Sequence, residues 1–242
     1  MRYPWPLLSA LFAACASETS GERVLVSWVL DQAEAADQAE FETQTGFRVE
    51  LDEARVELSS VYLYAPPSAR LSAFAWLERG LVSVAHAHGG IDNEKGRRVL
   101  AEWTKPMMID ALDSAPVELA DTSAEGGGVD AVKLLFNEGV VAHVRGRAER
   151  DGEQWRFEAE VSPAEEVTRA VELIELDEML AESSVVHVRV RPAAWLDLCD
   201  FSQLGEGSED LVTVGADSQV GRALSIGVRS PNAYSVYIDE ED

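Results

Sequence analysis

Cysteine is scarce in this chain of 242 residues, which contains only Cys15 and Cys199. Two cysteines exclude a small domain held together by several disulfides, so the fold has to rest on an apolar core. Hydrophobic residues make up 46% of the chain, which is ample for such a core. We predict that Cys199 is a buried, inert thiol, as unpaired cysteines in oxidising compartments usually are.

Basic residues are also few. The chain has 20 lysines and arginines against 44 acidic residues, and its formal net charge is −24. A surface with this charge repels phosphate backbones, so we expect no nucleic-acid partner. The same charge keeps the protein soluble and attracts cations.

Short catalytic motifs are missing. The sequence contains no Gly-x-Ser-x-Gly, no Walker loop, no Gly-x-Gly-x-x-Gly and no His-Glu-x-x-His. No pair of carboxylates stands out as a glycosidase pair either. We therefore expect a protein that is not an enzyme, and a hydrolase with dispersed carboxylates is the third and weakest of three functional hypotheses.

No apolar run is long enough for a membrane-spanning helix. The run at 7–14 follows Arg2 and precedes small residues, which is typical of a cleaved signal peptide over 1–14. Phe12-Ala13-Ala14-Cys15 is similar to a lipobox, which predicts a lipid on Cys15; simple cleavage and release is the alternative. Ala16 after the cysteine is typical of outer-membrane lipoproteins. We expect the membrane to be contacted through the lipid only, on the periplasmic or the surface side.

The rest of the chain has the pattern of a β protein. Hydrophobic residues alternate with charged ones over 47–51 and 155–161, and the alternation slips in phase near Ser59-Ser60, which indicates a bulge or turn. Further strands are predicted at 24–30, 56–63, 107–112, 117–119, 129–136, 140–148, 167–176, 185–190 and 233–238.

Turns and helices complete the predicted fold. Asn137-Glu138-Gly139 and Asp151-Gly152 have the composition of hairpin turns, and Asp217 is suited to cap a helix over 218–228. A short helix is predicted at 71–77. The fold class is therefore mainly β: an antiparallel β-sandwich or a meander-rich β domain with one C-terminal helix. We divide the chain into a signal peptide (1–14), a tether (15–23), one β-rich domain (24–238) and an acidic tail (239–242).

The most specific local motif is His86-x-His88, at the end of an apolar run and before Gly89-Gly90. Alternate residues of an extended chain point the same way, so the two imidazoles can bind one metal ion. The glycines allow the backbone to turn, which brings Asp92 or Glu94 back as a further ligand. Two nitrogen donors and a carboxylate suit zinc or copper(II).

The alternative is a metal-free lipoprotein with a structural role or an envelope protein partner, in which both histidines are polar residues at a strand end. The remaining histidines, His143 and His187, share strand faces with arginines, so we expect both on the wet side of a sheet. Trp195 is predicted to anchor the core.

Three segments resemble an uncharacterised class of β-rich bacterial envelope lipoproteins. They are Phe41-Glu42-Thr43 with 46–56, then Ala85-His86-Ala87-His88-Gly89, then 191–197 with Asp200-Phe201-Ser202. The class carries a His-Pro-Gly-His element where this chain has His88-Gly89-Gly90-Ile91, and His86 lies one strand step earlier. The resemblance implies an envelope address and a β fold, without an activity.

Overall fold

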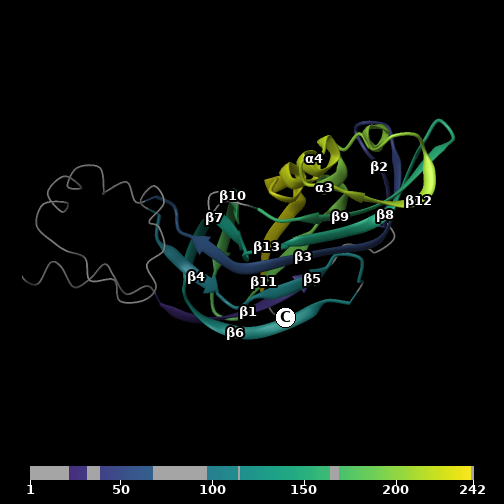
Figure 1. Cartoon of the computed structure of the whole chain (residues 1–242). Helices are drawn as coiled ribbons and strands as arrows, with labels where there is room; N and C mark the ends of the chain where they lie inside the picture. Colours follow the sequence, from purple (N-terminus) through teal and green to yellow (C-terminus); the bar gives the residue numbers. More distant parts are fainter. Residues whose placement is uncertain (1–21, 32–38, 68–96, 114, 164–168, 241–242) are drawn as a thin grey trace, which may run out of the picture.

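The computed structural model describes residues 22–31, 39–67, 97–113, 115–163 and 169–240 (Figure 1). Within these residues the predicted fold class is confirmed, since the chain forms two β-sheets with one helix of several turns near the C-terminus. The predicted signal peptide, Cys15 and the short helix at 71–77 lie outside the described residues.

The larger sheet has nine strands. Six of them follow the path β10-β7-β3-β8-β9-β12, while β2, β4 and β5 pair with β3 along the edge opposite β7 and β8. Their bounds are β2 Glu40–Glu42, β3 Arg48–Tyr64, β4 Val99–Trp103, β5 Met107–Asp110, β7 Gly127–Phe136, β8 Ala142–Arg150, β9 Glu153–Val161, β10 Ala170–Leu180 and β12 Ser208–Val214.

The smaller sheet has the order β13-β11-β1-β6. Its strands are β1 Arg23–Asp31, β6 Val117–Glu125, β11 Ser184–Val190 and β13 Tyr234–Glu240. Among the described strands, two pairings are parallel, β1 with β11 and β12 with β9. The sheets are thus mixed, because the two strands of each parallel pair, β1 with β11 and β9 with β12, are separated in the chain by other elements and not joined by a hairpin.

One predicted turn is wrong and one is confirmed. Asn137-Glu138-Gly139 does not close a hairpin, because β7 and β8 do not pair with each other: they lie end to end along one edge of β3, and β5 lies on the other edge. Asp151 and Gly152 do close the β8–β9 hairpin, with φ of 56° and 83°. Positive φ at both central residues is the conformation that matches the twist of a two-residue hairpin.

The long strand β3 organises the large sheet. It runs for 17 residues, and its pairing with β7 shifts register between Leu58 and Ser60. This is the predicted phase slip. Because the bulge adds one residue, the core-facing positions change from Val56 and Leu58 before it to Val61 and Leu63 after it. The strand therefore keeps one face on the core along its whole length.

The C-terminal helix α4 spans Gln219–Val228, and Ser218, not the predicted Asp217, caps it by accepting a hydrogen bond from the Gly221 amide. Ser218 is the residue whose extended backbone directly precedes the first turn. The short helix α3 packs against α4, and two 3-10 turns flank them. Their bounds are α3 Pro192–Leu196, η3 Phe201–Leu204 and η4 Pro231–Ala233.

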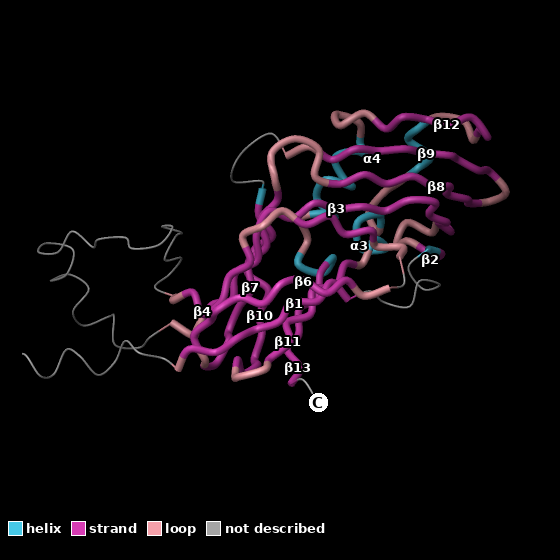
Figure 2. Tube along the Cα trace, turned by 90° about the horizontal axis from the view of Figure 1, so that it is seen from below, coloured by secondary structure: helices cyan, strands magenta, loops and turns pink. Residues whose placement is uncertain are grey.

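A single main core joins both sheets and the helices. At one end of the molecule, α3, α4 and η3 cover β8, β9 and the start of β3, and Phe201 packs against Phe47 and Phe157 with ring centroids 5.4 and 4.7 Å apart. At the other end the small sheet covers β3, β4 and β7, where Trp28 meets Trp103 at 6.3 Å. Figure 2 shows the two ends, with β12, β9 and β8 at one and β1, β11 and β13 at the other.

Candidate functional site

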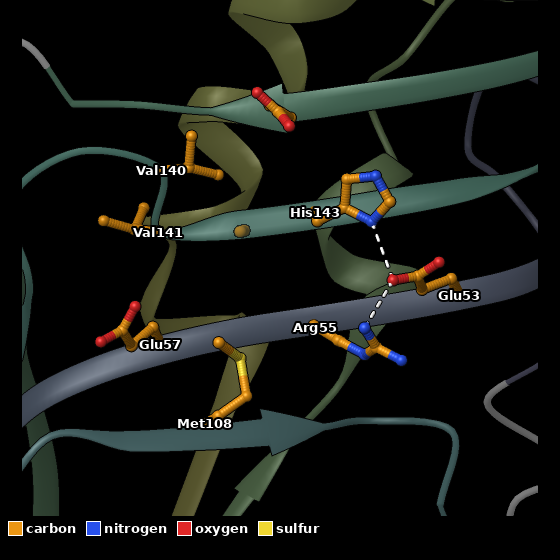
Figure 3. A pocket seen from close by; sticks show the side chains of 9 residues that line it. Glu53, Arg55, Glu57, Met108, Val140, Val141 and His143 are labelled. Atoms are coloured by element: carbon orange, nitrogen blue, oxygen red, sulfur yellow. Dashed lines mark ion pairs between the residues drawn. The ribbon is translucent and has the colours of Figure 1, made fainter.

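A recess of about 300 Å³ lies on the face of the large sheet that points away from the core (Figure 3). Successive side chains of a strand point to opposite faces of the sheet. Every second residue of β3 and β8 faces the core, and the residues between them point to the face that carries the recess. The residues that line it come from β3, β5, β8, β9 and the loop before β8: Glu53, Arg55, Glu57, Met108, Val140, Val141, Ala142, His143 and Glu160.

His143 is the central polar group of this recess. Its Nδ1 lies 3.1 Å from Oε1 of Glu53 on β3, and its Nε2 lies 3.1 Å from Oε1 of Glu158 on β9. The side chain is 23% exposed. A neutral imidazole has one N–H, so both contacts are donated hydrogen bonds only when both ring nitrogens carry protons.

Arginines hold Glu53 in place beside the histidine. Arg55 lies 3.0 Å from its Oε1 and Arg145 lies 3.8 Å from its Oε2. Arg55 also donates to Asp110 of β5 at 3.3 Å, so the chain of polar contacts crosses β5, β3, β8 and β9. A carboxylate on one ring nitrogen is the arrangement that orients histidines in metal and proton-transfer sites.

The fourth histidine of the sequence lies in a different cluster, on the outward face of the small sheet. The ring of His187 stacks on Tyr237 with centroids 4.5 Å apart and an interplanar angle of 3°. Its Nε2 is 3.7 Å from Asp239. Asp31 accepts hydrogen bonds from the Tyr237 hydroxyl and from Arg189, and these bonds link β1, β11 and β13.

In this second cluster, the pKa shifts are those of groups that are held in structural hydrogen bonds. Burial, followed by the hydrogen bond to Asp31, raises the pKa of Tyr237 to about 12. The hydrogen bond to Asp31 is the main cause of a raised pKa at Arg189. The phenol therefore keeps its proton at neutral pH and donates a hydrogen bond to the Asp31 carboxylate.

His143 and His187 lie on the outward faces of their sheets, as the alternation of residues along their strands predicted. Arg145 and Arg189 lie two residues further along the same faces. Sequence reasoning missed their partners. Glu53 and His143 are far apart in the chain and meet only because β3 pairs with β8, with Arg55 opposite His143. Glu158 was visible as a wet-face residue of β9, but no sequence signal paired it with His143.

The predicted metal ligands His86, His88, Asp92 and Glu94 fall in segment 68–96, which lies outside the described residues. The ends of that segment are well defined. Tyr64 at the end of β3 pairs with Val99 of β4, and the Ala65 amide donates to the Arg98 carbonyl at 2.8 Å. Within the described ranges, no group of three or more histidine, cysteine, aspartate and glutamate side chains is arranged to hold a metal ion.

Cys199 is buried, as predicted. It is fully enclosed in the core, and its thiol donates to the Val220 carbonyl at 3.7 Å. Burial raises its pKa to about 12, so the nucleophilic thiolate is absent at neutral pH. Trp195 is equally enclosed, which confirms it as a core anchor. No helix in the described part of the chain is long and apolar enough to cross a membrane.

Comparisons with known proteins found no matching family model and no matching curated protein. Among solved structures, the chain is similar to MbnP from Methylosinus trichosporium. The two are 11% identical, with a TM-score of 0.37, and the match covers 90% of this chain and 99% of the other. A likeness at this level carries no argument about the site or the activity of this chain.

Proposed function

We propose that the protein is a metal-binding module of the bacterial envelope that holds zinc or copper(II) through His86 and His88. Imidazoles two residues apart on an extended chain can share one metal, and Asp92 or Glu94 supplies an oxygen ligand after the glycine turn. The ion is part of a binding function and takes part in no reaction.

The observation that supports this proposal best is the anchoring of segment 68–96. Its two ends are joined by the ladder between β3 and β4, where Tyr64 is opposite Val99. The histidine pair therefore belongs to a connection that leaves and re-enters one rigid sheet. Binding residues commonly lie on connections of this kind, positioned by a rigid scaffold. The net charge of −24 adds a general attraction for cations.

A titration with matched histidine variants tests the proposal, because the chain has four histidines in two pairs. Calorimetric titration of the mature protein with Zn²⁺ and with Cu²⁺ should give one tight site. The variant His86→Ala/His88→Ala should lose affinity by about 100-fold or more, since it loses both nitrogen ligands.

The control variant is His143→Ala/His187→Ala, which removes the two histidines of the sheet faces. It should bind metal as the unaltered protein does. The proposal is wrong if neither metal binds, or if the His86→Ala/His88→Ala variant keeps its affinity. The protein would then be a metal-free structural or protein-interaction lipoprotein.

We further propose that the protein is exported and tethered to the outer membrane by a lipid on Cys15. The support is the match of residues 12–15 to a lipobox and the small, polar residues 16–22 that follow as a spacer. Mass spectrometry of the protein purified from bacterial membranes should show a diacylglycerol-modified Cys15 at the N-terminus. A soluble mature protein with an unmodified Cys15 would contradict lipidation and leave simple secretion.

A further inference from the structure

The outward face of the large sheet carries a row of charged side chains beside the recess. Arg55 of β3 lies opposite His143 of β8, and His143 lies opposite Glu160 of β9. Residues directly opposite one another share a face of the sheet and lie close together. Two residues away on each strand, a second row crosses the same face: Glu53, Arg145 and Glu158.

Both bases of the first row lie against the second row. The His143 ring has Glu53 at 3.1 Å from one nitrogen and Glu158 at 3.1 Å from the other. Arg55 lies 3.0 Å from Glu53 as well. Figure 3 shows the side chains of His143 and Arg55 meeting at Glu53, with Glu57 on the other side of the recess. The basic groups of the lining therefore lie on one side of it.

Two further carboxylates of the lining have no basic partner among the described residues. Glu160 is exposed, and no described residue forms a hydrogen bond or an ion pair with its side chain. Glu57 accepts a hydrogen bond from the side-chain amide of Asn137, which orients the carboxylate without neutralising it. Because β8 lies between β3 and β9, the backbones that carry the two glutamates are about 10 Å apart. A cation between these carboxylates has to offer donors in more than one direction.

The recess also has an apolar wall beside these carboxylates. Met108 of β5 and Val140 before β8 are 58% and 45% exposed, although both are large hydrophobic residues. The wall is preformed, because the Val141 amide donates to the Val161 carbonyl and the Val141 carbonyl accepts from the Glu57 amide, both at 2.8 Å. Exposed apolar side chains beside uncompensated carboxylates match a lysine or arginine side chain, which has an apolar stem and a charged head.

We propose that the recess is a docking site for a lysine or arginine side chain of a partner protein. The stem packs against Met108 and Val140, and the charged head lies between Glu57 and Glu160. Sites for small molecules enclose most of their ligand. This recess, with a volume of about 300 Å³ and half-exposed walls, has room for one side chain of a larger body instead. The net charge of −24 attracts a basic partner.

A titration of the full mature chain with short peptides, in the presence of a chelator, tests the docking. The probes are acetyl-Gly-Arg-Gly-amide and acetyl-Gly-Lys-Gly-amide, and the readout is the NMR signal of isotope-labelled methionine methyl groups. The Met108 methyl group should shift saturably, with a dissociation constant in the millimolar range because a single side chain binds weakly. Met179, which is 65% exposed on β10, is the internal control and should not shift.

Matched variants separate the effect of the two carboxylates from that of general charge. Glu57→Gln/Glu160→Gln should weaken the binding of both peptides at least about tenfold, because the charged head loses both carboxylates. Glu118→Gln/Glu182→Gln removes the same charge from exposed positions elsewhere and should bind as the unaltered protein does. Glu160→Gln alone breaks no hydrogen bond or ion pair between described residues, so it should fold normally and still weaken binding about threefold.

Two further probes test the chemistry of the ligand. One is acetyl-Gly-citrulline-Gly-amide, which is the uncharged counterpart of the arginine peptide, and the other is methylguanidinium, which lacks the stem. Both should bind at least about tenfold more weakly than the arginine peptide.

Several outcomes would overturn the docking. They are an unshifted Met108 signal, equal binding of the citrulline peptide, or unchanged affinity in the Glu57→Gln/Glu160→Gln variant. Equal binding of methylguanidinium would replace the partner protein by a free small cation, and a Met108 signal that changes on dilution of the protein alone would replace it by a second copy of the chain. The His86→Ala/His88→Ala variant should bind the peptides unchanged, so the docking and the proposed metal function fail separately.

Discussion

The two halves of β3 differ in how many faces they bury. From Arg48 to Glu57 the strand has one face on the core and one face of ion pairs and hydrogen bonds, whereas from Ser60 to Tyr64 both faces are enclosed. Phe201 of η3 packs on Phe47 just before the first half, and Trp28 of the small sheet packs on Trp103 of β4 beside the second half. One strand thus carries a site open to solvent at one end and a two-sided core at the other.

The largest effects are expected in the second half. Leu63→Ala on the core side should lower the free energy of unfolding by about 3 kcal/mol through lost burial and a cavity. Tyr64→Ala on the opposite face should cost about 3 kcal/mol or more, because that side chain is equally enclosed. Urea unfolding measures both. A cost near zero for Tyr64→Ala would show that its face is open and would break the comparison.

The next effect concerns the first half of β3, where the backbones of β3 and β8 approach closely. Gly146 of β8 lies opposite Leu51, and a Cβ at this position would be 2.3 Å from the Glu50 carbonyl oxygen. Gly146→Ala should therefore force β3 and β8 apart and lower the free energy of unfolding by about 2 kcal/mol. Gly215→Ala is the control, since nothing lies within 4 Å of a Cβ there. Equal unfolding midpoints for the two variants would contradict the predicted clash.

A smaller effect is expected on the outward face of the first half. His143→Gln removes the contacts to Glu53 and Glu158, which are partly solvated, so the loss should be about 1 kcal/mol or less. A double-mutant cycle with Glu158→Gln should give a coupling of about 0.5 kcal/mol between the two side chains. A loss of several kcal/mol would mean that this face is as enclosed as the second half.

The smallest effect is a pH dependence near the start of β3, where η3 packs on Phe47. The Ser202 hydroxyl donates to Asp200, and this hydrogen bond is the main cause of a lowered pKa at Asp200. A carboxylate with a lowered folded-state pKa stabilises the fold above its unfolded pKa, and this contribution is lost as the pH falls through the folded value. Asp200→Asn should therefore flatten the acid side of a stability-against-pH curve. An unchanged acid limb would show that Asp200 contributes nothing there.

Local patterns of the sequence predicted much of the fold. The alternation over 47–51 and 155–161 identified the buried faces of β3 and β9, and the slip near Ser59-Ser60 marked the real bulge. Three strands were missed. They lie in polar stretches of the sequence and are strands because β3 and β9 offer them pairing partners: Glu40–Glu42, Val99–Trp103 and Ser208–Val214. Pairing is a tertiary property, and short strands carry little signal of their own.

The candidate site residues also divide into those that the sequence pattern predicted and those that it did not. The metal ligands His86, His88, Asp92 and Glu94 were predicted from spacing within one short segment, and that prediction awaits its titration. The recess could not be predicted, because its polar centre joins Glu53, His143 and Glu158 from three strands. Alternation placed each of them on a wet face, but only the strand order β3-β8-β9 makes them neighbours.

What the sequence by itself determined is the set of periodic patterns: which residues of a strand share a face, where Asp151-Gly152 turns the chain and where the C-terminal helix lies. Side-chain direction follows from local backbone geometry, so these features need no distant partner. Only the tertiary structure decided that β7 and β8 lie end to end along one edge of β3 and that Tyr62 and Tyr64 are enclosed on the face opposite the main core. The order of strands in a sheet and the structure that covers a sheet face depend on which distant segments pack together. One alternating pattern of hydrophobic and polar residues is compatible with several such arrangements.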